Sequence, residues 1–279
     1  MHHPAWVSVH GGHSREFCAH AADTLDQMIG AYIDQGYAWV GITEHMPPVS
    51  DRFRYPDEVA LGLTVEAMHQ RFARYMALCR QYQARYADRI TIFVGFETET
   101  YSGAIPFVKD LRKEFSPDYI VGSVHHVANM PIDTCPADYQ AAAESLGGVE
   151  ALYLHYFDEQ LEMIDALAPA VVGHFDLVRI FDTDYGKRFR SPAIQARVRR
   201  NLERIRDLGL ILDLNLAALS KGATEPYLTE PILLQARELG IPVVPGDDAH
   251  SIHAVGRHMD DGIARLMKLG FDTSWTRPA

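Results

Sequence analysis

Residues 90–97 read ITIFVGFE, an apolar run that ends in one carboxylate, Glu97. Short runs rich in Ile, Val and Phe are typical of strands that are buried on both faces of a parallel sheet. Similar runs lie on either side of it, WVGITEH at 39–45 and YIVGSVH at 119–125, and each ends in a histidine. The chain therefore repeats one pattern, a buried strand followed at once by a side chain that can bind a metal or a proton.

The pattern extends over six runs of the sequence. The other three are WVSVHGG at 6–12, VVGH at 171–174 and IPVVPGDDAH at 241–250. A single histidine after a strand is most often a core residue, but six runs that end in imidazole or carboxylate are hard to explain by packing. With one further apolar run, the predicted strands are 6–10, 38–43, 91–97, 118–124, 170–173, 210–215 and 242–246.

The segments between these strands have the spacing of amphipathic helices. Apolar residues recur three and four apart, as in Leu202, Ile205 and Leu208, and this spacing predicts helices. The predicted helices are 23–36, 64–87, 104–115, 149–168, 191–208, 230–239 and 258–269. Strands that alternate with helices predict the α/β class with a parallel sheet. Seven strands predict a closed or nearly closed, distorted (βα)7 TIM-like barrel with an outer helical layer.

The chain has no long linker and no internal repeat, so residues 1–279 are expected to form a single domain. Two longer segments, 46–60 and 128–148, are expected to be irregular and to form pocket walls or lids, because both follow candidate ligands.

Composition limits the partners. The formal net charge of -11 argues against nucleic acid and anionic membranes as partners, because both reward an excess of Lys and Arg. It leaves a small phosphorylated substrate open, since bound cations would make the pocket positive. From the sequence we expect neither a transmembrane span nor a signal peptide. Cys18, Cys79 and Cys135 are expected to be reduced thiols in a cytoplasmic protein, with Cys18 as a small buried hydrophobe. The sequence leaves the oligomeric state open.

Strand geometry tests which candidate ligands can share a site. Asp248 and His250 are two apart and can reach one pocket, whereas His125 and the adjacent His126 should point in opposite directions. His10 and His13 are three apart, which a straight strand cannot reconcile with shared binding. A bulge at Gly11-Gly12 would re-aim one of them, because glycine permits it.

A carboxylate among histidines adds a chemical option. Glu97 has two oxygens and can bridge two cations that share one water, which lowers the pKa of that water from ~15.7 toward neutrality. Histidine donors favour Zn, Fe or Mn over Ca. The pattern therefore predicts a metal-dependent hydrolase with more than one ion. Asp176 has two equally plausible roles: it can orient an imidazole, or it can cap the start of a loop.

The ordered series HGGHSREFCAH, GITEH, VGFETE, VGSVHHV, VGHFDLVR, DLNLAALSKG and PGDDAH resembles the PHP superfamily of metallophosphoesterases, above all its histidinol-phosphate phosphatase branch. The resemblance covers about residues 7–256. It implies a distorted (βα)7 barrel with a trinuclear metal centre at the carboxyl ends of the strands. The first motif departs from the family, since Gly11 stands where His-x-His has its first histidine. We expect His10 to replace it through a bulge.

The resemblance also implies roles for individual residues. One metal would be held by His10, His13, Glu97 and Asp248, a second by Glu97, His125 and His174, and a third by His20, His45 and His250. Asp248 is also the expected catalytic residue, and the basic residues expected to bind phosphate are Arg179, Lys221 and Arg15.

The expected reaction is hydrolysis of L-histidinol phosphate to L-histidinol and phosphate, a step of histidine biosynthesis, by a metal-bridging hydroxide. Glu16, Glu99 or Asp247 can pair with the substrate amine. Four alternative functions remain. The protein could hydrolyse another small phosphate ester, cleave a nucleic acid, or cleave a C–N bond as amidohydrolase-type enzymes do. It could also bind metal without catalysis.

Overall fold

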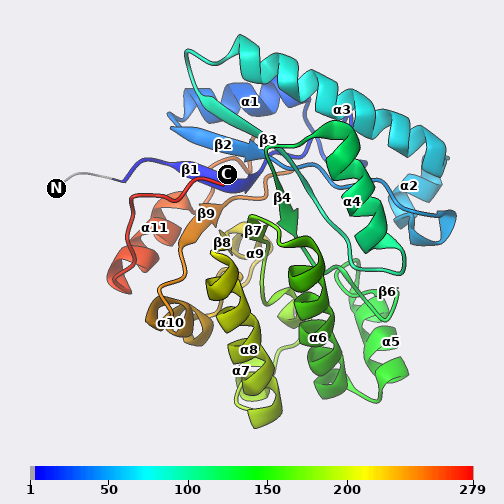
Figure 1. Ribbon diagram of the computed structural model, residues 1–279, viewed down its shortest axis with the longest axis vertical. Coiled ribbons are helices and arrows are strands. Elements are labelled where there is room, and N and C mark those ends of the chain that lie inside the picture. The colour runs from blue at the N-terminus through cyan, green and yellow to red at the C-terminus, as the bar shows by residue number, and fades with distance from the viewer. Residues whose placement is uncertain (1–3, 279) are drawn as a thin grey trace.

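The computed structural model describes residues 4–278. Seven parallel strands form one sheet in the order β1-β2-β3-β4-β7-β8-β9, and the helices surround it (Figure 1). All seven predicted strands are present, and their bounds are β1 Val7–Gly11, β2 Trp39–Ile42, β3 Thr91–Glu97, β4 Tyr119–Gly122, β7 Val171–Val172, β8 Ile211–Asn215 and β9 Val243–Gly246. The prediction of an α/β fold with parallel strands is confirmed.

The two ends of the sheet approach each other at their carboxyl ends. The amide of Asp248, just beyond β9, donates a hydrogen bond to the carbonyl of His10 in β1, at 2.8 Å. The amide of His13 donates to the carbonyl of Ala249, also at 2.8 Å. The sheet is therefore a nearly closed barrel, as the strand number predicted, and its first and last strands are tied beside the candidate ligands.

The seven predicted helices are also present, with ends within two residues of the expected ones. They are α1 Leu25–Asp34, α3 Val65–Arg85, α4 Ala104–Phe115, α6 Val149–Leu167, α8 Pro192–Leu208, α10 Glu230–Glu238 and α11 Met259–Lys268. Local chemistry fixes several ends. The Thr24 hydroxyl accepts from the amide of Gln27 at the start of α1, and Gly209 ends α8 in the left-handed region at φ +67°. No helix among residues 4–278 is long and apolar enough to cross a membrane.

The two segments expected to be irregular contain helices, one short and one of three turns. Residues 46–60 include α2, Pro56–Ala60, and residues 128–148 include α5, Pro136–Leu146, beside a hairpin of β5 His126–Val127 and β6 Met130–Pro131. The prediction for 128–148 was therefore wrong in part. Pro136 begins α5 and Gly147 ends it at φ +97°, but its alanine-rich sequence has weak apolar periodicity. The remaining short helices are α7 Tyr185–Arg188 and α9 Ala217–Ser220.

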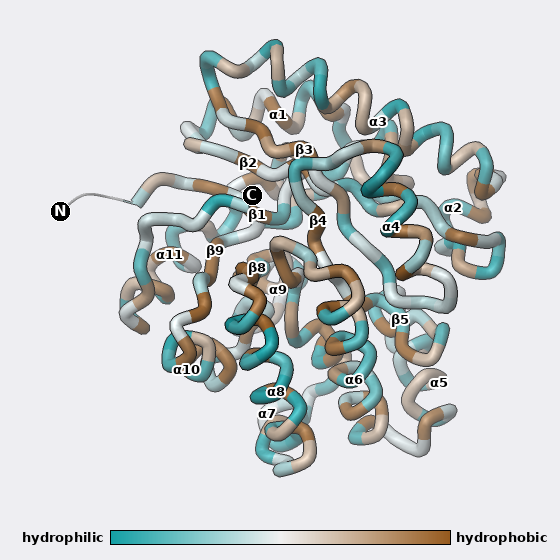
Figure 2. Tube along the Cα trace, in the orientation of Figure 1, coloured by the Kyte–Doolittle hydropathy of each residue, from teal (hydrophilic) through white to brown (hydrophobic). Residues whose placement is uncertain are grey.

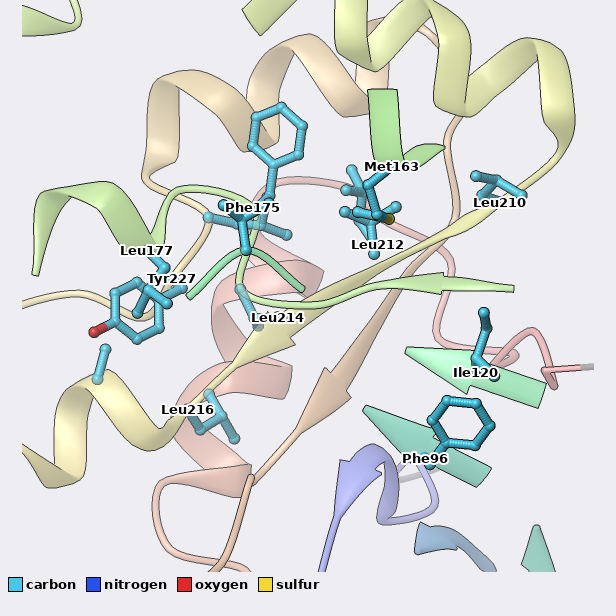
Figure 3. Close-up of a cluster of buried hydrophobic side chains, with 14 of the residues drawn as sticks. Phe96, Ile120, Met163, Phe175, Leu177, Leu210, Leu212, Leu214, Leu216 and Tyr227 are labelled. Atoms are coloured by element: carbon cyan, nitrogen blue, oxygen red, sulfur yellow. The ribbon is translucent and has the colours of Figure 1, made fainter. Parts of the chain in front are cut away.

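The apolar core has two parts that use alternate strand residues. The larger part packs the strands against the helices, and Figure 3 draws a portion of it, with Leu212 of β8 beside Met163 of α6. In Figure 2 polar residues run along α8, while apolar residues mark β8 and β9. A smaller cluster comes from strand residues such as Val9, Tyr119 and Val244. Because these alternate with the helix-facing residues, they fill the barrel beneath the carboxyl ends.

Candidate metal centre

The carboxyl ends of the strands surround one cavity of about 370 Å³. A volume of this size suits a small metabolite rather than a polymer. Its wall contains residues from the ends of β2, β3, β4, β7 and β9 and from the loops that follow β1, β2, β4, β7 and β8. The lining residues are His20, His45, Tyr55, Pro56, Asp57, Glu97, His125, Asp133, Thr134, His174, Leu177, Lys221, Tyr227, Asp248 and His250. The fold thus gathers imidazoles and carboxylates at the carboxyl ends of the strands, as expected.

Glu97 stands between two histidine groups. Its Oε2 lies 3.0 Å from Nδ1 of His45 and 3.4 Å from Nε2 of His10. Its Oε1 lies 2.9 Å from Nε2 of His174 and 3.2 Å from Nε2 of His125. Glu97 is the last residue of β3 and is 2% exposed. One carboxylate oxygen therefore faces each group, the arrangement that a bridge between two cations needs.

His10 reaches the site through an irregularity in β1. Ser8 pairs with Val40, yet Gly11 pairs with Ile42, so β1 has one extra residue between these pairs. The extra residue falls at Val9-His10, just before the Gly11-Gly12 position that the sequence predicted. Gly12 follows at φ +57°, a conformation that favours glycine. The expected bulge is present, one or two residues earlier, and the His10 ring is fully buried beside Glu97.

A second histidine cluster lies beside the first. The ring of His13 stacks on those of His250 and His45, with centroids 4.1 Å and 4.4 Å away. Asp248 lies between the clusters, its Oδ1 at 3.2 Å from Nε2 of His13 and 3.9 Å from Nε2 of His10. Its backbone has φ +47°, which is strained for a residue with a side chain and is typical of functional positions. His125 lines the cavity and His126 does not, although Nδ1 of each ring lies near the carboxylate of Glu99, at 3.2 and 3.0 Å.

Three buried carboxylates orient candidate histidine ligands, and this role was not predicted from the sequence. Oδ2 of Asp213 lies 3.0 Å from Nδ1 of His10, and Oε2 of Glu44 lies 3.6 Å from Nδ1 of His13. Oε1 of Glu99 lies 3.2 Å from Nδ1 of His125. Acidic residues inside an apolar strand or directly after one were the available signal, because a buried carboxylate needs a partner.

The charges of the site depend on one another. Burial by itself raises the pKa of Glu97, but the neighbouring His10 and His125 outweigh it and hold that pKa well below its usual range. Burial lowers the pKa of His13, yet the neighbouring carboxylates of Asp248 and Glu44 raise it to about 9. The same balance raises the pKa of His45 to about 10, with Glu97 among its causes. The carboxylates thus demand positive charge in a buried place, and bound divalent cations would satisfy that demand.

The donor atoms meet a direct test of metal binding. Buried ring nitrogens of His10, His13, His45, His125, His174 and His250 have no hydrogen-bond partner. Several nevertheless approach carboxylate oxygens to 3.0–3.4 Å, as ligands around a shared ion do. Within the described residues, three groups bring their donor atoms within 4.8 Å of one another. They are His10, His13 and Glu97; Glu97, His125 and His174; and His13, Cys18, His45 and His250. The residues present therefore fit transition-metal ions.

His20 lies outside these three groups. Its side chain is 51% exposed, and its Nδ1 lies 3.1 Å from Oδ2 of Asp57 in α2. Its ring stacks on that of His250 with the centroids 4.8 Å apart. The structure thus places His20 at the rim of the cavity. Cys18, expected as a small buried hydrophobe, is buried but lies among the donor atoms of the third group.

The three basic residues expected to bind phosphate have different positions. Lys221 follows α9 and lines the cavity. Arg15 is exposed and lies outside the cavity lining. The expectation for Arg15 followed from its place in the first motif, but the turn after Ser14 directs it to the surface. Arg15 is therefore not placed to contact a substrate in this cavity.

Arg179 is buried behind the cavity wall. Its Nη2 donates to the carbonyls of Glu225 and Pro226, and its guanidinium lies 4.9 Å from the ring centre of Tyr227. Asp176 accepts hydrogen bonds from the amides of Leu228 and Thr229 at 2.7 and 2.9 Å. Both residues hold the segment that carries Tyr227 into the cavity. Arg179 was expected to contact phosphate and Asp176 to orient an imidazole, but in the structure both residues hold this segment instead.

The carboxylates expected to meet an amine lie outside the lining too. Glu16 accepts from the amide of Leu25, and Asp247 accepts from Ser8 and Tyr32. Glu99 lies behind His125. Asp57 and Asp133 line the cavity in their place, and Oδ1 of Asp133 is buried without a partner.

Comparison with known proteins agrees with this geometry. The PHP domain family model matches residues 11–217. The chain is 34% identical over 268 residues to a Schizosaccharomyces pombe protein that carries the histidinol-phosphatase name, covering 95% of this chain and 87% of that one. It is 31% identical over 281 residues to the histidinol-phosphatase of Saccharomyces cerevisiae, covering 88% and 84%.

Solved structures share the fold. The hisK structure from Listeria monocytogenes superposes with a TM-score of 0.80 at 25% identity, covering 92% of this chain and 99% of that chain. Histidinol phosphate phosphatase from Lactococcus lactis, solved in complex with zinc, L-histidinol and phosphate, superposes with a TM-score of 0.72 at 17% identity, covering 96% and 94%. The chain belongs to the PHP domain family, in its histidinol-phosphatase branch.

Proposed function

We propose that this protein hydrolyses L-histidinol phosphate to L-histidinol and phosphate with the help of divalent cations at the open end of the barrel. Membership of the histidinol-phosphatase branch supports the substrate and places the protein in histidine biosynthesis. The placement of Glu97, with one oxygen toward each of two histidine groups, carries the proposal for the chemistry. Three free cysteines support the proposal of a reducing, cytoplasmic location.

The proposed centre holds two or three ions of zinc, iron or manganese. His10, His13, Glu97 and Asp248 form the first set of ligands, and Glu97, His125 and His174 the second, as the resemblance implied. When bound, such ions activate water and neutralise charge on phosphoryl oxygens. The protein contributes the fixed positions of these side chains, which Asp213, Glu44 and Glu99 orient from behind.

The cavity walls suit the two ends of the substrate. Lys221 supplies positive charge for the phosphate at the cavity mouth. Asp133, whose Oδ1 is buried without a partner, supplies an acceptor for the amine, with Asp57 as a second carboxylate. Tyr227 and Leu177 provide an apolar wall for the imidazole. The nucleic-acid alternative lacks such support, because the net charge of -11 and a cavity of only about 370 Å³ disfavour a polymeric substrate.

A substrate panel with metal analysis tests the proposal. We expect kcat/KM for histidinol phosphate to exceed that for p-nitrophenyl phosphate by roughly ten- to a hundredfold, because one charged contact to the amine contributes ~1.5–3 kcal/mol. A chelator should abolish both activities, and added zinc, iron or manganese should restore them. Equal kcat/KM values for both esters would contradict the substrate assignment. Full activity with less than one metal per chain would contradict the metal centre.

A further inference from the structure

The turn after α9 brings Tyr227 to the cavity wall in a strained conformation. Tyr227 is 3% exposed and lines the cavity, and its amide donates to the carbonyl of Asn215 in β8 at 3.0 Å. The next residue, Leu228, has φ +76°, in the left-handed region that residues with side chains rarely adopt. Such a conformation persists only where the contacts around it outweigh its cost. The place of Tyr227 in the wall therefore depends on the groups that anchor the turn.

Glu225 anchors the turn from the side that precedes Tyr227. Its Oε1 accepts a hydrogen bond from the hydroxyl of Tyr185 in α7 at 2.8 Å. Its Oε2 accepts from the guanidinium of Arg265 in α11 at 3.0 Å and from the amide of Glu230 at the start of α10 at 3.2 Å. One carboxylate thus ties the turn to three helices.

A chain of contacts also links Glu225 to the ring of Tyr227. The guanidinium of Arg179 packs on two rings, 5.0 Å from the centre of Tyr185 and 4.9 Å from the centre of Tyr227. The same guanidinium donates to the backbone carbonyl of Glu225 at 3.1 Å. Glu225 holds the Tyr185 hydroxyl at one end of this chain, and Tyr227 forms the other end at the cavity. A change at Glu225 is therefore transmitted to the cavity wall.

The negative charge of Glu225 suits its surroundings, because every group that faces its oxygens is a donor. Its side chain is 17% exposed and that of Arg265 is 24% exposed, so water screens their ion pair only in part. Glu230 also lies near Arg265, at 3.3 Å, but is 53% exposed and is the weaker partner. A glutamine at position 225 would turn an N–H2 group toward either Tyr185 or Arg265 and lose that hydrogen bond.

We propose that Glu225 is a positioning residue for the substrate, which holds Tyr227 in the wall against which the imidazole packs. The inference rests on the proposed function, in which Tyr227 and Leu177 form the imidazole side of the cavity. Glu225 lies outside the cavity lining, so it acts through Tyr227 and touches no reacting group. Its replacement should weaken binding of the imidazole end of the substrate and leave the phosphate end unaffected.

Ligand binding to the metal-loaded protein tests the inference. In Glu225→Gln the Kd of L-histidinol, measured by calorimetry, should rise about two- to tenfold, the range for packing against one aromatic ring. The Kd of inorganic phosphate should stay as in wild type. Tyr227→Ala should weaken L-histidinol binding at least as much, and Glu225→Gln should have no further effect in that background. Glu230→Gln, the matched control, removes a carboxylate beside the same Arg265 and should bind both probes like wild type.

Hydrogen exchange measures the turn without a ligand. The amides of Tyr227, Leu228 and Thr229 all donate to protein acceptors. They should exchange roughly tenfold faster in Glu225→Gln, because a hydrogen bond to a charged group is lost, and at the wild-type rate in Glu230→Gln. Tyr185→Phe removes only one hydrogen bond to Glu225 and should change exchange and L-histidinol binding in the same direction. This variant decides if Glu225→Gln does not fold.

The outcomes separate this inference from the proposed function. An unchanged Kd of L-histidinol in Glu225→Gln would overturn the inference even if histidinol phosphate is hydrolysed. Equal losses for L-histidinol and phosphate, or a full effect of Glu225→Gln in the Tyr227→Ala background, would also overturn it, since a general loss of structure has that result. If wild type does not bind L-histidinol, the proposed substrate is contradicted, and the exchange rates decide whether Glu225 holds the turn.

Discussion

The Oδ2 atom of Asp213 lies 3.0 Å from Nδ1 of His10, and both side chains are fully buried. Asp213 comes from the middle of β8, which carries none of the expected ligands. Its carboxylate fixes the proton of His10 on Nδ1, so that Nε2 faces Glu97 and Asp248 at 3.4 and 3.9 Å. Gly246 of β9 makes room for this pair, because a Cβ there would collide with Oδ1 of Asp213.

Replacing Asp213 with asparagine should weaken the first cation site while the barrel still folds. An amide can hold His10 in the wrong tautomer and does not raise the basicity of its ring. Loss of such an orienting carboxylate lowers metal affinity by about ten- to a hundredfold. Competition with a chromophoric chelator measures the affinity, and circular dichroism checks the fold. Asp207→Asn, at the exposed end of α8, is the matched control, and an unchanged affinity in Asp213→Asn would refute the orienting role.

Glu97→Ala should reduce turnover by several orders of magnitude, because the bridge and the activated nucleophile are lost together. Elemental analysis should show fewer bound ions, and Glu97→Gln should behave in the same way, since an amide is a poor bridging ligand. Glu114→Ala, at an exposed position at the end of α4, should have wild-type turnover. Near-normal turnover in a metal-replete Glu97→Ala protein would exclude a bridge.

The strand ends were predictable because each ligand follows an apolar run whose length and composition are local properties. Glu97 and His174 could be placed at one face from strand direction alone. Asp213 could not, because its partner His10 is 203 residues away and nothing local indicates that pairing. The assignment of residues 1–279 to one domain stays a prediction.

Side chains in loops were the least predictable part of the site. Arg179 and Lys221 both follow strands, yet only the fold shows that Arg179 turns inward to carbonyls of another loop. Cys18 and His20 are two apart in a turn, where no fixed periodicity tells which one lies among the other candidate donor atoms. Loop conformation depends on contacts such as Ser14 with Glu44, which the sequence does not encode locally.

Neutralising Lys221 and Arg179 should have different effects. Lys221→Met should raise KM for histidinol phosphate and p-nitrophenyl phosphate alike and leave the melting temperature unchanged, because this exposed lysine meets only the phosphate. Arg179→Met should lower stability by about 1–3 kcal/mol, since the carbonyls of Glu225 and Pro226 lose their buried donor. Thermal melts and steady-state kinetics on both variants distinguish these effects. An undiminished melting temperature in Arg179→Met would argue against its structural role.

Glu159 gives a test of stability against pH. Burial raises the pKa of Glu159 to about 6 from the ordinary value of 4.5, and its Oε1 accepts from the amide of Ala128. A carboxyl whose pKa is raised by folding favours the folded state below pH 4.5 and loses that contribution as the pH rises through 6. The melting temperature of Glu159→Gln minus that of wild type should therefore increase as the pH rises from 4.5 to 6.5. Glu162→Gln, exposed on the same helix, should show a constant difference, and a constant difference for Glu159→Gln would contradict the shift.

Asp133 should decide between substrates with and without an amine. Its carboxylate lines the cavity, and its Oδ1 is buried without a protein partner, so a cationic amine would satisfy it. Asp133→Asn should raise KM for histidinol phosphate by roughly ten- to a hundredfold, because a hydrogen bond to a charged group contributes ~1.5–3 kcal/mol. The kinetics for p-nitrophenyl phosphate, which has no amine, should stay as in wild type. Asp110→Asn, on the outer surface of α4, controls for the loss of one negative charge. Equal losses for both esters would show that Asp133 supports the site as a whole, and no loss for either would leave Asp57 as the carboxylate that meets the amine.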